Sequence, residues 1–552
     1  LIIIYKDNMM KKYIAILILT LACACGCSKF LDPEQVDLIY NEVFWKTQTD
    51  AEVGLSGTYA LYRGLMANSN NWYSRADATT GFIRAGWNGG SSQYLYTNGI
   101  YTDIANPSKM WGSLEDYSDW SNFYKVVAQA NMVIRKIDEI PDSKFKEGQK
   151  DRILGEAYFL RALVYFNILR IWGNAPYISE MIESSSQVID KDLSPVVIPR
   201  TEDIDICQNV LADVNKAVEL LKFNAPGGDG WGITADKGAA LALCGHVNMW
   251  MWFLVRRDRV PGVNASDYVK AAVTALEDFR DHSNRSYVQY TDMKSVQSMY
   301  RGGSTEAVFE LNISTESSES YRADMAGVTA RTCKMESFDG DPMKDRSTQI
   351  DWVPASQKAK MYPEYDFATK TGDIRPKLFF DAWDSEYNEP VNDTGGAEND
   401  RTKVTWLTKY AMFTADKDKK VDEYVAYFAE ANIPVFRYTD IMLLLAEAYV
   451  RNKQYGKATA IVNDIRGRAK IGDYKGNDSG LADEIMQQRI AELFGEGCLY
   501  FDMVRNNYFP NDHLMAPAKY KQEGYYWPVS SSIMKMNPLI SQTPYWDGKT
   551  RW

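Results

Sequence analysis

Aromatic side chains that could bind a sugar are concentrated in residues 67–119, a loop-rich stretch without sustained helical or strand periodicity. A flat ring stacks on the apolar C–H face of a sugar, and an amide side chain bonds its hydroxyl groups. Long loops inside compact domains are commonly functional. If the ligand is a glycan, this stretch supplies the residue types that its binding needs, and the candidate residues are Trp72, Tyr73, Trp87, Asn88, Tyr94 and Tyr96.

A second group of aromatic residues lies in residues 283–432, which also lack a regular period. Trp352 joins the ligand-binding candidates from this stretch, and Trp383 and Trp406 are weaker ones. The alternative for any one of these rings is that it packs a loop onto the scaffold. That alternative applies most strongly to the tyrosines of the same stretch, Tyr287, Tyr290, Tyr300 and Tyr321.

Signals of catalysis are absent from the sequence. A glycoside hydrolase needs two facing carboxylates, and the 73 acidic residues single out no such pair. No G-x-S-x-G, H-E-x-x-H or phosphate-binding glycine-rich loop occurs. His246 lies in an apolar helical segment and is predicted to be a satisfied core group. We therefore expect a protein that is not an enzyme, with no catalytic residue, cofactor or metal ligand, and keep a glycoside hydrolase on a helical scaffold as the second alternative.

The cysteines that follow residue 27 form neither a zinc motif nor a disulfide framework. Cys207, Cys244, Cys333 and Cys498 are not spaced as C-x-x-C, and three of them lie in apolar helical surroundings. Buried thiols are expected.

The charge balance argues against a nucleic-acid partner. Lys and Arg number 62 and Asp and Glu 73, which gives a net charge of −11, and no basic run is present. Phosphate contact requires clustered cations.

The first 26 residues have the pattern of a lipoprotein signal peptide. Lys11 and Lys12 precede an apolar run, residues 13–22, that is too short to span a bilayer. Gly26-Cys27-Ser28 has the small residue that lipoprotein processing requires before the cysteine, so Cys27 is the expected lipidation site. Cys23, Cys25 and an ordinary signal peptide are the alternatives. A lipidated cysteine would hold the protein at a membrane surface.

Residues 433–471 predict two antiparallel helices joined by a short polar turn at residues 451–454. Thr439 or Asp440 is expected to cap the first helix. The tetratricopeptide pattern W-x2-L-G-x2-Y followed by A-x3-F fits the pair with substitutions that preserve size. The matching residues are Met442, Leu445, Ala446, Tyr449, Ala458 and Val462. Any other helical hairpin is the alternative.

Helical periodicity extends from about residue 45 to 282 and returns from 433 to 505. Between them, residues 283–432 contain short β-like pieces such as 307–313, and the chain closes in a proline-punctuated tail. The expected fold is mainly α. It consists of a tetratricopeptide-like scaffold of helical pairs, an irregular loop-rich ligand lobe at 283–432, and the loop insertion at 67–119.

Four segments then occur in a characteristic order: CSKFLD at 27–32, GEAYFLRALVYFNILRIWGNAP at 155–176, PVFRYTDIMLLLAEA at 434–448 and NPLISQTPYW at 537–546. Together they resemble the SusD/RagB family of Bacteroidota outer-membrane lipoproteins, over nearly all of residues 27–552. The sequence departs from the family at Gln488, where Glu is usual, at Cys498, where Arg is usual, and at 542–545, where the usual Asn and Gly are missing. These departures concern local ion pairs.

The resemblance implies one nutrient-binding domain, residues 27–552, that faces the outside of the cell. It also implies a partner, a SusC-like TonB-dependent transporter, to which the captured nutrient is delivered. The usual ligands of the family are oligosaccharides, and a peptide-binding RagB-like uptake protein is the first alternative. A pure interaction scaffold is a third possibility, since tetratricopeptide arrays commonly bind peptides.

Overall fold

The computed structural model describes residues 44–68, 75–83, 117–181, 197–313, 353–384, 405–410, 412–421, 424–429, 431–510 and 515–549. The signal peptide and Cys27 lie outside these ranges, so the lipidation site stays a prediction.

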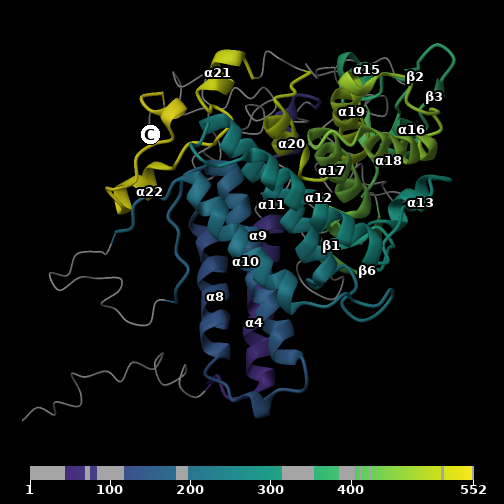
Figure 1. Cartoon of the computed structure of the whole chain (residues 1–552). Coiled ribbons are helices and arrows are strands. Elements are labelled where there is room, and N and C mark those ends of the chain that lie inside the picture. Colours follow the sequence, from purple (N-terminus) through teal and green to yellow (C-terminus); the bar gives the residue numbers. More distant parts are fainter. Residues whose placement is uncertain are drawn as a thin grey trace, which may run out of the picture.

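Long helices stacked side by side form the scaffold (Figure 1). Each of the helices from α8 to α12 packs against the next, and α4 packs against α8 and α9. Apolar residues at helical spacing supply the buried faces, as in α8, where Phe123, Val126, Val127 and Ala130 are buried. The bounds are α4 Gln48–Asn68, α8 Ser121–Ile137, α9 Gln149–Trp172, α10 Asp203–Leu220, α11 Lys237–Asp258 and α12 Ala265–His282.

The scaffold continues with helices from the last quarter of the chain. They are α17 Tyr438–Arg451, α18 Tyr455–Arg468, α19 Leu481–Leu493 and α20 Leu499–Asn506. Helix α12 packs directly against α17, although residues 283–437 separate the two helices in sequence. Helices α17 and α18 form the predicted hairpin and contact α19. The mainly helical fold expected from the sequence is confirmed.

Helix α11 lies at the centre of the core. It is the one helix, among the described residues, that is long and apolar enough to cross a membrane, and its apolar window is wholly buried in the protein. Asp236 caps its first turn by accepting a hydrogen bond from Ala239 N at 2.8 Å. A helix that is apolar all round belongs in the interior of a large core.

Gly245 marks a close approach of α11 to α12, because a Cβ there would overlap the side chain of Leu276. Gly245→Ala is expected to lower the free energy of unfolding by about 1–3 kcal/mol, since overpacking outweighs the better helix propensity of Ala. Gly467→Ala on α18 is the matched control. Nothing lies within 4 Å of the added methyl group there, so it should be neutral or stabilise by up to about 1 kcal/mol. Equal effects of both changes in urea denaturation would contradict the close packing.

The caps expected at Thr439 or Asp440 are wrong. Helix α17 begins at Tyr438, after Arg437 in an extended conformation with no side-chain cap. The preceding residues form strand β8, Ile433–Arg437. Both expected caps are buried and serve tertiary contacts instead. Thr439 Oγ1 donates to Glu306 Oε2 at 2.7 Å, and Asp440 Oδ1 accepts from Arg489 at 2.5 Å.

Within the described residues, four two-stranded antiparallel sheets lie outside the helical stack. The buried strand β1, Ala307–Leu311, pairs with β8 and so joins the two ends of the stretch between α12 and α17. The other pairs are β2 Tyr365–Asp366 with β3 Thr371–Gly372, β4 Phe380–Asp381 with β5 Trp406–Leu407, and β6 Phe413–Val421 with β7 Tyr424–Ala429. The short helices here are α13 Met293–Ser298, α15 Ala355–Met361 and α16 Arg375–Phe379.

The tail returns to the end of α9. Trp527 N donates to Ile171 O at 2.7 Å, and Trp172 Nε1 donates to Pro528 O at 3.1 Å. Gln542 holds the tail on itself, since its amide accepts from Val529 N at 2.7 Å and donates to Val529 O at 2.9 Å. The tail also contains the short helices α21 Pro517–Lys521 and α22 Ser531–Met536, which the sequence did not indicate.

Candidate functional site

The predicted ligand-binding residues Trp72, Tyr73, Trp87, Asn88, Tyr94, Tyr96 and Trp352 all lie outside the described residues. Their roles therefore stay predictions. The structure describes residues 75–83 and 117–120, which border the first six candidates in sequence. The scaffold holds both borders through buried charged side chains.

Arg75 ties the two borders of residues 84–116 together. Its Nε and Nη2 donate to Tyr117 O at 3.0 and 2.6 Å. The buried guanidinium also lies over the rings of Tyr117, Phe123, Trp172 and Trp527, at 5.2–5.8 Å from their centroids. Stacking on rings and bonding a carbonyl satisfy a cation that would be costly to bury alone. The base of the insertion is thus fixed to α8, the end of α9 and the tail.

Asp77 fastens the same segment to the turn between α19 and α20. It begins the short 3-10 helix η1, Asp77–Thr80, and its Oδ2 accepts from Gly497 N at 2.5 Å. Its Oδ1 is buried without a hydrogen-bond partner. Burial raises the pKa of Asp77 to about 7, against the opposing effect of the Gly497 and Gly495 N–H groups. Nearby, the ring of Phe82 packs edge-on against Phe494.

The stability of the Asp77→Asn variant, relative to that of the wild type, is expected to increase as pH rises. The raised pKa means that folded Asp77 binds a proton between about pH 4 and 7 while the unfolded chain does not, so stability falls as pH rises through this window. The asparagine side chain of the variant does not titrate, so the variant does not lose this stability. The difference in free energy of unfolding between variant and wild type should increase by about 1–3 kcal/mol from pH 5 to pH 8. Asp229→Asn, at an exposed turn, gives the baseline; a pH-independent difference for Asp77→Asn would contradict the raised pKa.

Three of the weaker aromatic candidates of the second stretch, Trp383, Tyr290 and Tyr300, pack the interior of the protein. Trp383 is buried against Tyr362 and Phe380, whose ring centroids lie 5.1 Å away. Tyr290 and Tyr300 are buried, and their hydroxyl groups donate to Glu492 at 2.7 Å and Glu496 at 3.0 Å. The side chain of Trp406 lies outside the described part of the structure, as does Tyr321.

A buried ion cluster joins the strand pair β1–β8 to α18 and α19. Arg437 pairs with Glu306 at 2.7 Å and with Glu496 at 2.6 Å. Arg468 pairs with Glu306 at 2.5 Å and with Glu492 at 2.9 Å. This cluster fixes the stretch between α12 and α17 to the helical scaffold. Other buried charges extend it, namely Arg375, Asp373 and Lys409.

The departure at Gln488 fits this cluster. Its amide oxygen accepts from Arg375 at 2.8 Å, and its amide nitrogen donates to Glu484 at 2.8 Å. A neutral amide therefore completes the contacts of Arg375, whose charge is already matched by Asp373 and Glu492.

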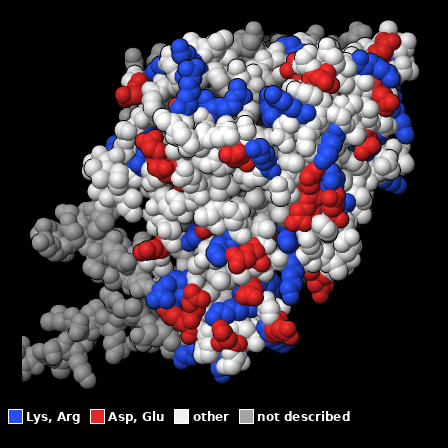
Figure 2. All heavy atoms as spheres, in the orientation of Figure 1, with Lys and Arg blue, Asp and Glu red and all other residues white. Residues whose placement is uncertain are grey.

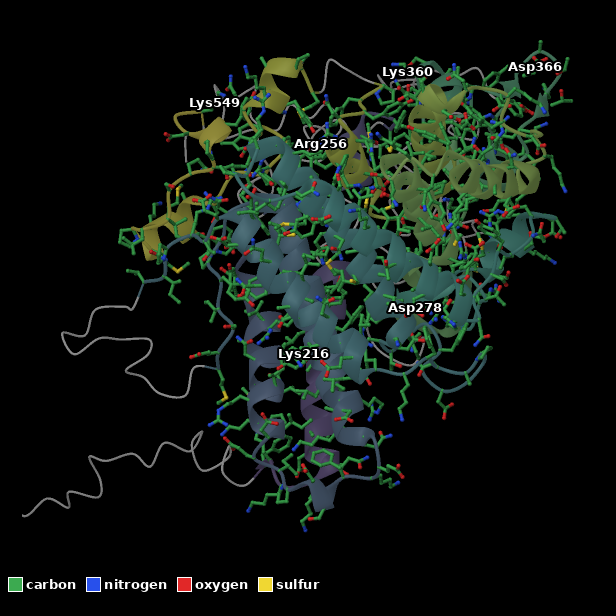
Figure 3. All side chains as sticks on the ribbon, viewed as in Figure 1. Lys216, Arg256, Asp278, Lys360, Asp366 and Lys549 are labelled. Atoms are coloured by element: carbon green, nitrogen blue, oxygen red, sulfur yellow. The ribbon has the colours of Figure 1, made fainter. Side chains whose placement is uncertain are left out.

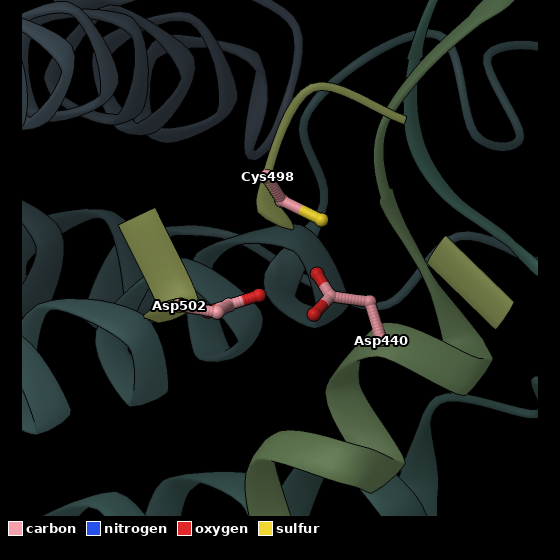
Figure 4. Close-up of side chains that lie close together, drawn as sticks. All are labelled: Asp440, Cys498 and Asp502. Carbon is pink, nitrogen blue, oxygen red and sulfur yellow. The ribbon is translucent and has the colours of Figure 1, made fainter. Parts of the chain in front are cut away.

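Asp440, Cys498 and Asp502 bring three potential metal ligands together (Figure 4). Arg489 Nη2 lies 2.5 Å from Asp440 Oδ1 and 2.6 Å from Asp502 Oδ2, so a guanidinium already provides the positive charge there. Burial opposes ionisation, but His246 and Arg489 hold the pKa of Asp440 well below its usual range. Burial raises the pKa of the Cys498 thiol, which favours the neutral form over the thiolate that binds metals. This group is an ion-pair cluster of the core.

His246 belongs to the same core, as predicted. Its Nε2 lies 3.1 Å from Asp440 Oδ2, and its ring stacks on Phe436 at 5.1 Å. Cys207, Cys244 and Cys498 are buried free thiols, also as predicted, and Cys333 lies outside the described residues.

On the face shown in Figure 2, acidic and basic side chains are interspersed over an otherwise uncharged surface. This face has no field of a single sign that would attract a polyanion.

Sequence reasoning missed Arg75, Asp77 and the ion cluster. Arg75 and Asp77 lie in an aromatic stretch without a period, where nothing local shows that a charged residue is buried. The local sequence Arg75-Ala76-Asp77-Ala78 gives no signal of that burial.

Comparisons with known proteins agree with this architecture. The family model described as "SusD family" matches residues 305–546, and the model described as "Starch-binding associating with outer membrane" matches residues 58–244. The SusD-like protein P38 of Formosa agariphila is 26% identical to this chain, over 96% of this chain and 98% of that protein.

Solved structures share the fold. A SusD homologue from Bacteroides thetaiotaomicron superposes with a TM-score of 0.71 at 23% identity, over 91% of this chain and 99% of that one. A laminarin-binding SusD-like protein gives a TM-score of 0.64 at 21% identity, over 90% of this chain and 99% of that one. With two family models that together match most of the sequence and relatives along nearly its whole length, the chain belongs to the SusD-like family.

Proposed function

We propose that this protein is a non-catalytic, glycan-binding lipoprotein of the outer membrane. It captures oligosaccharide or polysaccharide at the cell surface and delivers it to a SusC-like TonB-dependent transporter. Lipidated Cys27 anchors it to the membrane. The single observation that supports glycan capture best is the match of the starch-binding family model to residues 58–244, since these include the aromatic stretch 67–119.

The ligand surface in this proposal consists of the sequence-predicted residues Trp72, Tyr73, Trp87, Asn88, Tyr94, Tyr96 and Trp352. The buried contacts of Arg75 and Asp77 support it, because they fix the base of the insertion to the scaffold. The charged side chains of the described clusters pair with one another inside the core, which argues against acid–base catalysis by these groups.

Binding of the soluble protein, truncated after Cys27, tests the proposal. The probes are soluble starch, laminarin, other plant, host and microbial polysaccharides, and a peptide mixture, by retardation in polysaccharide-loaded gels followed by calorimetry. Saturable glycan binding without release of fragments supports capture. Peptide binding in place of glycan binding would establish the RagB-like alternative, and released sugar products would establish a hydrolase.

Trp87→Ala is expected to weaken binding of the retained glycan about tenfold, the loss that corresponds to roughly 1.4 kcal/mol of stacking energy. Tyr474→Ala, which removes a half-buried ring between α18 and α19, is the matched control and should bind normally. Co-purification of the full chain with a transporter barrel should survive the Trp87 change. Loss of co-purification in that variant would contradict the assignment of this stretch to the ligand.

A further inference from the structure

The β2–β3 hairpin presents an aromatic ring at an outer edge of the protein, where Asp366 is labelled in Figure 3. Phe367, in the turn of this hairpin, is 39% exposed. Every other Phe, Tyr or Trp ring whose side chain the structure describes is less exposed. An exposed ring costs free energy in water, and single exposed apolar residues are common. The surroundings of Phe367 distinguish it from such a residue.

The turn that carries Phe367 is fixed by its own hydrogen bonds. Asp366 Oδ1 accepts from Ala368 N at 2.8 Å and from Thr369 N at 3.3 Å, and Asp366 Oδ2 accepts from Thr369 Oγ1 at 2.8 Å. Gly372 has φ +101°, and a Cβ there would overlap Glu364 O. The ring is thus presented in one arrangement, which reduces the entropy that a ligand contact must overcome.

The ring rests on other aromatic side chains. Phe367 stacks on Trp383 with ring centroids 6.2 Å apart and an angle of 25° between planes, and Tyr365 meets it edge-on at 5.0 Å. Trp383 lies beneath it, 2% exposed. The open part of the Phe367 ring therefore lies on the side away from Trp383, and it is flat, apolar and supported.

A hydrogen-bond donor, Lys377, and an acceptor, Asp384, lie beside Tyr365, the ring that meets Phe367 edge-on. Lys377 Nζ is 3.5 Å from Asp384 Oδ2 and donates to Lys370 O at 2.9 Å. Tyr365 donates to the other carboxylate oxygen of Asp384. Both charged side chains keep solvent access, so the ammonium group can donate to a hydroxyl and the carboxylate can accept from one.

Together these side chains offer an exposed aromatic face, a hydrogen-bond donor and a hydrogen-bond acceptor. An aromatic face with adjacent hydroxyl-binding groups is the chemistry that recognises a sugar ring.

We propose that the β2–β3 hairpin is a second carbohydrate-contact site, at which Phe367 stacks on one sugar ring and Lys377 and Asp384 bond its hydroxyl groups. This inference rests on the proposed function, because it adds a contact for the same glycan. A weak second contact raises affinity only for a chain long enough to reach both sites. Long polysaccharides should therefore depend on Phe367, and short oligosaccharides should not.

The test uses the soluble protein truncated after Cys27, with soluble starch and laminarin as long probes and maltotriose and laminaritriose as short ones. Phe367→Ala is expected to weaken binding of the retained polysaccharide about fivefold to tenfold and to leave the matching trisaccharide unchanged. Phe367→Tyr should restore the polysaccharide affinity. Met293→Ala on α13 is the matched control, since it removes an apolar side chain of similar exposure, 37%, away from the hairpin.

The outcomes separate this inference from the function on which it rests. If the wild type binds polysaccharide and Phe367→Ala binds it equally well, the second site is overturned and glycan capture stands. If neither the wild type nor Phe367→Ala binds any glycan, both the second site and the proposed glycan capture are overturned. An equal loss for long and short probes would show that the ring acts on a single site, and loss of transporter co-purification alone would show that it contacts protein; either result overturns the proposal. Unchanged circular dichroism and melting temperature establish that the variant is folded.

Discussion

Replacing Glu492 with alanine is expected to lower the free energy of unfolding by about 3–5 kcal/mol, as removal of one partner from a buried ion pair leaves an uncompensated charge. Glu492 is fully buried, and its carboxylate lies 2.9 Å from Arg468 and 3.2 Å from Arg375. Its loss would take one carboxylate partner from each guanidinium group, leaving Arg468 with Glu306 and Arg375 with Asp373, and would remove the acceptor of the Tyr290 hydroxyl. Urea denaturation measures the effect.

Glu219→Ala is the matched control for Glu492→Ala, because Glu219 pairs with Lys216 at 2.9 Å on the exposed surface of α10. Exposed pairs contribute about 0–1 kcal/mol, so this change should have little effect. If Glu492→Ala cost no more than Glu219→Ala, the cluster would not hold the strand pair to the helices.

The cluster also predicts an acid-sensitive fold. Burial alone would raise the pKa of Glu492, but Arg468, Arg375 and Arg437 hold it well below its usual range. The unfolded chain therefore binds a proton at Glu492 before the folded chain does, so the contribution of Glu492 is complete above about pH 4.5 and is lost as pH falls. In Glu492→Ala, the part of the pH dependence below pH 4.5 should be shallower.

Replacing Trp172 with alanine is expected to cost about 3–5 kcal/mol, the range for removing a large aromatic ring from a core. Trp172 is fully buried at the end of α9, edge-on to Trp120 at 5.8 Å and Phe123 at 5.2 Å. Its ring also supports Arg75 and its indole N–H bonds Pro528 O. The cavity would therefore loosen α8, the tail and the base of the insertion together.

Trp172→Phe separates the ring from its hydrogen bond. It keeps much of the aromatic volume and loses the N–H donor, so it should cost less than half as much as Trp172→Ala. Thermal denaturation followed by circular dichroism compares the two. Equal losses would mean that the bond to Pro528, and not the packing of the ring, carries the contribution of Trp172.

The helices were predictable because their information is local. Apolar residues at i, i+3 and i+4 in 441–449 predict a helix with one buried face, whatever partner covers that face. Helix α17 forms there. Strand β8 was not predictable from its own residues, because its partner β1 lies more than a hundred residues earlier. For the same reason Thr439 and Asp440 resembled helix caps, while their partners Glu306 and Arg489 come from distant segments.

In the candidate site too, features that depend on local sequence were predictable and features that depend on distant partners were not. Composition identified an aromatic stretch suited to sugars, and its ring positions stay predictions. The buried Arg75 and Asp77 that hold its base depend on Tyr117, Trp527 and Gly497, none of which is near them in sequence. His246 was predictable as a core group from its apolar helix, whereas its pairing with Asp440 required the fold.

The return of the tail to α9 has a consequence for the order in which the protein can fold. Trp527 N donates to Ile171 O, and Pro528 O accepts from the Trp172 indole. The residues of the second pair are 356 positions apart in the sequence. Ser530 N likewise bonds Ser118 O. Contacts this distant close late and slow the rate-limiting step of folding. During synthesis, the aromatic cluster around Trp172 therefore stays exposed until residues 525–530 have been made and pack on it. Chaperones and proteases have their best access to the chain during that interval.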